Sequence, residues 1–328
     1  MQIAVLGAGA WGTALAMSYA AGGHAIRLWT LDEKHASDMR AQRINQHYLP
    51  GLTLSDNIQI SSSLDESLQD AELILIVTPV AGLRPTLTAL HQRGNKVPVL
   101  WACKGFESGS GLLPHEVVAE ILGALHPCGA LTGPSFAAEV ARGMPCAITL
   151  ASQDAAFAAD WAARLHHPLL RLYANGDVIG AEVGGAVKNV LAIAAGISDG
   201  LGYGLNARAA LMTRGLAEIA RLAEALGGRR ETLMGLAGMG DLILTCTGDL
   251  SRNRRVGLAL AEGKALPEVL KELGHVAEGV LTCEFVVERA NRLQVEMPIT
   301  RLVHAVLSGQ IPARNALEQL MARDPRHE

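Results

Sequence analysis

The sequence predicts an α/β protein in which an N-terminal Rossmann-type doubly wound sheet is followed by an all-helical C-terminal domain. Apolar runs typical of strands alternate with helical patterns up to about residue 176, a glycine-rich turn follows the first run, and only helical patterns occur afterwards. Alternating strands and helices form parallel βαβ units. The 328 residues are about twice the size of a common domain, which suits a division into 1–176 and 177–328.

The N-terminal part begins with a continuous apolar run, residues 2–6, which is typical of a strand buried on both faces. A helix of small residues is expected over 12–21, where a pair of glycines ends it. A second clear helix is expected over 112–125, because apolar residues recur at helical spacing as far as Leu125. Further strands are expected at 25–29, 57–61, 73–77, 97–102, 129–132 and 146–151.

The C-terminal part shows helical patterns without a low-complexity linker before it. The passage from strand to helix is therefore expected near residues 175–177, where a hinge could close two lobes around a ligand. The expected helices run over 178–198, 206–226, 231–238, 252–262, 266–273, 279–293 and 299–307.

Composition and charge exclude several classes of protein. The net charge of −4, without blocks of like charge, argues against nucleic acid as a partner. No membrane span is expected, because the apolar stretch at 71–83 is short and broken by Pro79, and the N-terminus lacks the basic region of a signal peptide. Five widely spaced cysteines without a CxxC pair indicate reduced thiols in the cytoplasm, and the histidine spacing gives no reason to expect a metal.

The motif Gly7-Ala8-Gly9-Ala10-Trp11-Gly12 has the GxGxxG spacing of a dinucleotide-binding turn. Gly7 permits the tight turn, Gly9 lets the backbone approach the pyrophosphate, and Gly12 lets helix and strand pack closely. The N-terminus of the following helix offers amide donors to an anion. Its position directly after the first strand therefore predicts a nicotinamide dinucleotide, although a lone glycine motif is a weak signal.

The choice between NADH and NADPH is less clear from the residues. A site for NAD alone places an acid at the end of the second strand to hold the ribose 2′-hydroxyl. That position is Thr30 here, with Asp32 two residues later and Lys34 near enough to receive a phosphate. We therefore lean towards NADPH, with use of both cofactors left open.

Lys188 is the most unusual charge in the chain. It lies in a helix of small and apolar residues, and its neighbours Gly184, Gly185 and Ala192 leave its face nearly bare. A desolvated ammonium there should have a lowered pKa, which suits proton exchange with an alkoxide. The alternative is a structural lysine whose charge reaches the edge of the helix.

Basic residues also occur at an unexpected place, the start of the helix 252–262. Ser251 is a suitable N-cap, but Arg252 and its basic neighbours oppose the helix dipole. A bound phosphate would explain this arrangement, and a solvated basic turn is the alternative. Lys104 follows the strand 97–102, and so lies at the edge of the sheet where ligands bind.

The chain resembles the bacterial NAD(P)-dependent glycerol-3-phosphate dehydrogenase family along nearly its whole length. The resemblance rests on several separate blocks in the right order, which together are far more specific than any one motif. The blocks are GAGAWGTALA (7–16), CKGFE (103–107), LTGPSFAAEV (131–140), VGGAVKNVLAIAAGISDGLGYGLNARAAL (183–211), GLAGMGDLILTCTGDLSRNRRVG (235–257) and VAEGV (276–280).

The resemblance implies hydride transfer between NAD(P)H and dihydroxyacetone phosphate, giving sn-glycerol 3-phosphate for phospholipid synthesis. It implies that Lys188 exchanges the proton, assisted by Lys104 and Asp241. The other implied substrate positions are Gly133, Ser135, Ser251, Arg252 and Asn253. The implied cofactor positions are Gly7, Gly9, Ala10, Trp11, Gly12, Leu31, Tyr48, Lys104, Ala137, Arg252, Val276 and Glu278.

The chain departs from the family's pattern at two of these positions. Ala10 stands where serine is common, and Leu31 stands where a polar residue is common. Two other functions stay open: a β-hydroxyacid dehydrogenase of the same two-domain plan, and a non-catalytic NAD(P)-binding sensor. The oligomeric state also stays open, a homodimer included.

Overall fold

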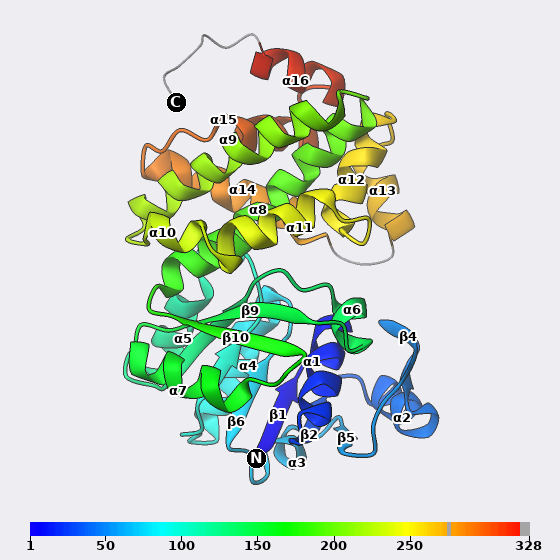
Figure 1. The fold of residues 1–328 in the computed structure, drawn as a ribbon, viewed down its shortest axis with the longest axis vertical. Coiled ribbons are helices and arrows are strands. Elements are labelled where there is room, and N and C mark those ends of the chain that lie inside the picture. Colours follow the sequence, from blue (N-terminus) through cyan, green and yellow to red (C-terminus); the bar gives the residue numbers. More distant parts are fainter. Residues whose placement is uncertain (274–276, 322–328) are drawn as a thin grey trace. The chain divides into compact units, whose positions relative to one another are not determined.

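The structure is a computed structural model that describes residues 1–273 and 277–321 (Figure 1). The chain forms two compact units. The first comprises Met1–Glu107 and Leu112–Val178, and the second comprises Ser108–Gly111 and the chain from Ile179 onwards.

The first unit is built on an eight-stranded sheet with the order β10-β9-β8-β7-β6-β1-β2-β5. The pairs are parallel except β8 with β9, which are antiparallel. All the expected strands are present, while β10 and the separate hairpin β3–β4 were not predicted. The bounds are β1 Gln2–Leu6, β2 Ala25–Trp29, β3 Ile44–Asn45, β4 Leu49–Thr53, β5 Ile58–Ser61, β6 Leu73–Ile76, β7 Val99–Trp101, β8 Cys128–Thr132, β9 Cys146–Ala151 and β10 Leu170–Asn175.

The antiparallel β8–β9 pair corrects the expectation of parallel units throughout. An apolar run shows that a strand is buried but carries no information on its direction, so periodicity gave no warning of the reversal. The other sequential connections keep the parallel arrangement, and the carboxyl ends of β1, β6, β7 and β8 therefore meet at one edge of the sheet.

Helices cover both faces of this sheet (Figure 1). Tyr19 of α1 and Trp161 of α7 belong to the same core as the sheet residues Val5 and Leu131, while α4 and α5 lie on the opposite face. The bounds are α1 Ala10–Ala21, α2 Glu33–Gln42, α3 Leu64–Leu68, α4 Val80–Gln92, α5 Pro114–Leu122, α6 Ala137–Ala141 and α7 Ala155–Leu165.

The helix expected over 112–125 is shorter than predicted. It ends at Leu122, because Gly123 takes a φ of 91°, a conformation that breaks the helix. Leu125 lies beyond this end and is 98% exposed, so its assignment to the buried helical face was wrong.

The second unit contains helices and no strand among its described residues. The expected helix over 231–238 is instead a four-residue helix followed by a π-helical turn, η1, and α11 and α16 were not predicted. The bounds are α8 Val178–Gly200, α9 Gly204–Ala225, α10 Arg230–Leu233, η1 Leu236–Gly240, α11 Asp241–Thr247, α12 Arg252–Ala261, α13 Leu266–Leu273, α14 Glu278–Arg292, α15 Pro298–Leu307 and α16 Ala313–Met321.

Helix α8 forms the buried core of the second unit. It is long and apolar enough to cross a membrane, but 94% of its most apolar stretch is buried inside the folded chain, as in a core helix. Its glycines admit neighbouring backbone directly. A Cβ on Gly196 would lie 2.1 Å from the Arg254 carbonyl oxygen, and a Cβ on Gly257 would lie 2.1 Å from that of Ile193. Helices α8 and α12 therefore touch backbone to backbone.

Candidate active site

The glycine-rich turn between β1 and α1 has no room for side chains at two of its glycines. Gly7 has a φ of +122°, and a Cβ there would lie 2.8 Å from the Val77 carbonyl carbon. A Cβ on Gly12 would lie 1.8 Å from the Gly7 oxygen. The turn thus confirms the packing that the motif predicts for both glycines.

Gly9 differs from its neighbours, because a Cβ there would meet nothing within 4 Å. It stands at the start of α1, which has no side-chain cap and no acidic residue in its first turn. The first amide groups of the helix are therefore available to an anion beside an open space. These features fit the pyrophosphate of a dinucleotide.

Asn45 of β3 holds the glycine-rich turn in place and was missed by the sequence analysis. Its buried side chain donates from Nδ2 to the Ala8 carbonyl oxygen at 2.9 Å and to Thr13 Oγ1 at 2.8 Å. Its Oδ1 accepts from the Tyr48 amide at 3.2 Å. No local pattern could have identified Asn45, since its two Nδ2 partners lie more than 30 residues away.

The carboxylate nearest the end of β2, Asp32, serves as a helix cap. Asp32 is the N-cap of α2, where one carboxylate oxygen accepts from the Lys34 amide at 2.8 Å and the His35 amide at 3.2 Å. Leu31 is 83% exposed beside it. This geometry is compatible with either nicotinamide dinucleotide, and the preference for NADPH stays a prediction.

Two further turns follow neighbouring strands at the edge of the sheet where the glycine-rich turn lies. Lys104 follows β7, and Gly133 follows β8 with a φ of +138°. Ser135 Oγ donates to the Gly133 carbonyl oxygen at 3.0 Å, which stabilises this turn, and Ala137 begins α6. Parallel strands thus place the glycine-rich turn, Lys104 and Gly133 at one edge of the sheet.

In the second unit, Lys188 of α8 is buried and paired with a carboxylate. Its Nζ lies 2.8 Å from Asp241 Oδ1 and donates to Thr245 Oγ1 at 2.7 Å. Thr245 in turn donates to the Asp241 carbonyl oxygen at 2.6 Å. Lys188 is 7% exposed and Asp241 is 2% exposed, so this is an ion pair in the protein interior.

The ion pair corrects the expectation of a bare helix face around Lys188. That face admits the backbone of η1, since a Cβ on Gly184 would lie 2.6 Å from the Ala237 oxygen. Asp241 directly follows η1 and therefore lies beside the ammonium. The carboxylate favours the charged form of the lysine, whereas burial alone, on which the sequence-based expectation rested, favours the neutral form.

Cys246, beside Thr245 on α11, takes no part in this chemistry. Burial raises the pKa of its thiol to about 12, so it stays protonated at neutral pH.

The start of α12 has the expected cap but fewer unpaired charges than the sequence suggested. Ser251 Oγ accepts from the Arg254 amide at 3.2 Å, which confirms Ser251 as the N-cap. Arg252 is exposed, without an ion pair to any described residue. Arg254 is paired instead, with Asp199 at 2.8 Å and Asp249 at 3.0 Å.

Asn253 links three helices of the second unit. Its Nδ2 donates to Asn189 Oδ1 of α8 at 3.0 Å, and its Oδ1 accepts from the Gly279 amide of α14 at 3.0 Å. Asn189 also donates to Glu278 Oε2 at 3.2 Å. Glu278 thus joins the same network, and Asn189 is a second residue that the sequence analysis missed. Val276 lies outside the described residues.

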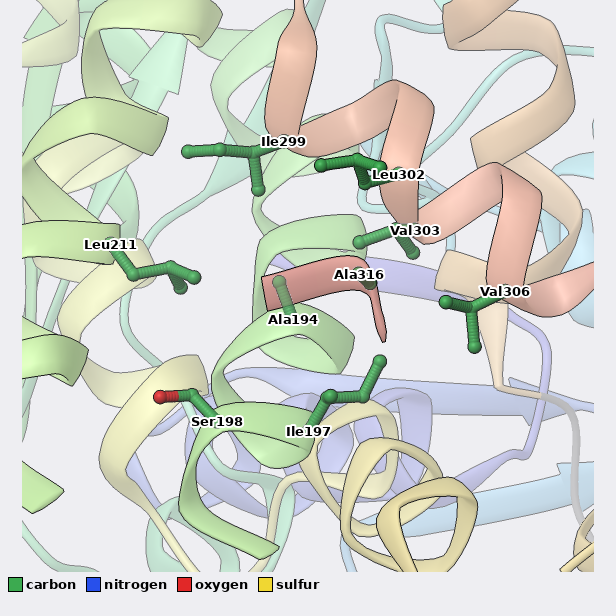
Figure 2. A pocket seen from close by; sticks show the side chains of 9 residues that line it. All are labelled: Ala194, Ile197, Ser198, Leu211, Ile299, Leu302, Val303, Val306 and Ala316. Carbon is green, nitrogen blue, oxygen red and sulfur yellow. The ribbon is translucent and has the colours of Figure 1, made fainter. Parts of the chain in front are cut away.

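An apolar cavity lies elsewhere in the second unit, between α8, α9, α15 and α16 (Figure 2). Eight of its nine lining side chains are aliphatic, and the ninth is Ser198. Its volume of about 20 Å³ suits a single water molecule. It offers no charge to a phosphate. No cluster of three or more metal-ligating side chains occurs among the residues that the structure describes.

Comparisons with known proteins cover both units. The family description "NAD-dependent glycerol-3-phosphate dehydrogenase N-terminus" matches residues 2–158, and the corresponding C-terminus description matches residues 177–318. The protein named glycerol-3-phosphate dehydrogenase [NAD(P)+] from Dechloromonas aromatica is 61% identical over 100% of this chain and 99% of its own length.

Solved structures show the same fold. Glycerol-3-phosphate dehydrogenase from Coxiella burnetii is 44% identical, with a TM-score of 0.94 over 98% of this chain and 99% of that one. A 3-hydroxyisobutyrate dehydrogenase from Salmonella typhimurium is 14% identical, with a TM-score of 0.52 over 94% of this chain and 93% of that one. The second likeness concerns the fold alone.

Proposed function

Since the chain belongs to the NAD-dependent glycerol-3-phosphate dehydrogenase family, we propose that Lys188, Asp241 and the start of α12 form the substrate half of its active site. The protein is an NAD(P)-dependent dehydrogenase that transfers a hydride reversibly between the nicotinamide and dihydroxyacetone phosphate. The observation that carries the proposal is the buried Lys188–Asp241 pair. Lysines are seldom buried, and buried charged groups are common at functional sites.

The two predicted domains divide the work in this proposal. Residues 1–176 bind the dinucleotide, and residues 177–328 bind the substrate and supply the proton. The open space at Gly9 beside the uncapped start of α1 supports the first assignment. The Lys188–Asp241 pair supports the second.

The amide groups at the start of α1 would hold the pyrophosphate of the dinucleotide. The other proposed cofactor residues contribute side chains or backbone around it, and NADPH is proposed as the preferred form. A bound nicotinamide supplies the hydride. The proposed cofactor residues are Gly7, Gly9, Ala10, Trp11, Gly12, Leu31, Tyr48, Lys104, Ala137, Arg252, Val276 and Glu278.

Lys188 donates the proton that the ketone oxygen of dihydroxyacetone phosphate needs as its carbon is reduced. Its positive charge also stabilises the alkoxide that develops on that oxygen. In the reverse direction the neutral amine accepts the hydroxyl proton of glycerol 3-phosphate. Asp241 and Thr245 hold Nζ in one position for this step.

The phosphate of the substrate binds at the start of α12 in this proposal. The helix amides, the Ser251 hydroxyl and the Arg252 guanidinium, which pairs with no described carboxylate, supply donors and positive charge. Lys104, Gly133, Ser135 and Asn253 are the remaining proposed substrate residues. Binding the phosphate at a fixed point orients the ketone for hydride transfer.

The test is the initial rate of NADPH and NADH oxidation with dihydroxyacetone phosphate, for the wild type and Lys188→Ala. The variant is expected to lose activity by roughly 100- to 10,000-fold, the range of general acid–base catalysis, while dinucleotide binding persists. Retained turnover would move the proton transfer elsewhere, with Lys104 as the next residue to test. Cofactor binding without turnover in the wild type would favour the sensor alternative.

The location, the physiological role and the assembly of the enzyme belong to the same proposal. The enzyme acts in the cytoplasm, it supplies glycerol 3-phosphate for phospholipid synthesis, and a homodimer is one assembly to test. Analytical ultracentrifugation of the purified protein measures the last of these directly.

A further inference from the structure

Helix α12 is tied to α8 at three points along its first turns. Asn253 donates to Asn189, which directly follows Lys188. The Arg254 backbone lies against Gly196, where no side chain would fit. The Arg254 guanidinium reaches Asp199, in the last turn of α8. The start of α12 is therefore held against the helix that carries Lys188.

Asp199 is the most heavily engaged acceptor in this frame. Its Oδ2 lies 2.9 Å from Arg254 Nε and 2.8 Å from Arg254 Nη2. The same oxygen accepts from Arg208 Nη1 of α9 at 3.0 Å. The side chains of Asp199 and Arg254 are only 12% and 13% exposed, so water screens their attraction little.

A second carboxylate, Asp249, contacts the same guanidinium at 3.0 Å, but its side chain is 98% exposed. Exposed ion pairs contribute little to stability. The chain thus provides two carboxylates on one arginine: Asp199 is buried and also binds Arg208 of α9, whereas Asp249 is exposed. Asp249 is therefore the control for an exposed contact with the same guanidinium.

We propose that Asp199 is a positioning residue for the phosphate of the substrate. By holding Arg254, it holds the first turn of α12, where Ser251 and Arg252 stand, at a fixed distance from Lys188. It also compensates the Arg254 charge, which would otherwise oppose the helix dipole. The inference rests on the proposed function, which places a phosphate monoester at this helix start.

The experiment compares Asp199→Asn, Asp249→Asn and Arg252→Ala in the full-length protein. The readouts are KM for dihydroxyacetone phosphate, the inhibition constant of inorganic phosphate, and NADPH affinity from nicotinamide fluorescence. Asp199→Asn is expected to raise KM and the inhibition constant roughly 10-fold, because a small misplacement weakens a geometric site. NADPH affinity should change much less, because Arg252 is only one of the proposed cofactor residues. Asp249→Asn is expected to stay within about twofold of the wild type.

The variants separate this inference from the proposed function. If Arg252→Ala leaves phosphate inhibition unchanged, the phosphate binds elsewhere and the proposed site is wrong. If Arg252→Ala weakens phosphate inhibition but Asp199→Asn behaves like Asp249→Asn, only the positioning role is overturned. Equal losses of phosphate and NADPH binding in Asp199→Asn would show a general structural role and also overturn it.

Asp199→Glu provides a second route if the asparagine variant does not fold. It keeps the charge on a longer side chain, so it should retain the fold while shifting the first turn of α12. A weaker phosphate inhibition with a much smaller change in NADPH affinity supports the positioning role. Phosphate inhibition equal to that of the wild type overturns it.

Discussion

The Lys188–Asp241 pair makes a direct prediction about stability. Both side chains are at least nine-tenths buried, and their charged atoms are 2.8 Å apart. Removing one member of such a pair leaves a charge in the interior without compensation. Broken buried pairs typically destabilise a protein by about 3–5 kcal/mol. Because Thr245 still accepts a hydrogen bond from Lys188, we expect Asp241→Ala to lie near the lower end, about 3 kcal/mol.

A double-mutant cycle separates the pair from its surroundings. Lys188→Met keeps the length of the side chain and removes its charge, so it should destabilise the protein through the unpaired carboxylate. The double variant Lys188→Met/Asp241→Ala leaves neither charge behind. We therefore expect it to be more stable than the sum of the single changes implies, by about 1–3 kcal/mol.

Urea denaturation, followed by circular dichroism, gives the free energies of unfolding. Because the chain has two compact units, the transition of the helical unit is the one to compare. Single variants that lose less than about 1 kcal/mol, or losses that simply add, would refute the idea that the pair is a buried, coupled unit.

Three further predictions concern packing and pH. Gly196→Ala would place a Cβ 2.1 Å from the Arg254 oxygen, where ordinary contact begins at 3.4 Å, so we expect a loss of about 1–3 kcal/mol and a lower kcat/KM. Gly235→Ala, whose Cβ would lie 3.5 Å from the Thr232 oxygen, is the control, and equal effects of the two would contradict the contact. Ser198→Ala removes a buried hydroxyl that has no hydrogen-bond partner among the described residues. Thermal denaturation should therefore show stability that is equal to that of the wild type or higher by up to about 1 kcal/mol. A clear loss of stability would indicate a hidden partner of this hydroxyl. Burial lowers the pKa of His24, His126 and His167 from 6.5, so the unfolded chain takes up protons first as the pH falls. The first unit should therefore lose stability below about pH 6.5, and equal melting temperatures at pH 7.5 and 5.5 would argue against this.

Local patterns determined the fold class and the two kinds of domain. The alternation of strand and helix, the glycines at 7, 9 and 12, and the Ser251 cap all act within a few residues of the chain. Their structural consequences follow from backbone geometry and helix capping, which depend only on neighbouring residues. The helical stops were also local, including Gly123, which ends α5 earlier than its apolar pattern suggests.

The contacts between distant residues and the directions of the strands depend on the tertiary structure. Asp241 meets Lys188 only because η1 lies against a glycine of α8, and Asn45 holds the glycine-rich turn from a different strand. Strand β9, which is antiparallel to β8, likewise has an apolar run like those of the parallel strands. Periodicity reports how deeply a segment is buried, but neither its direction nor its partners, which depend on how distant parts of the chain pack together.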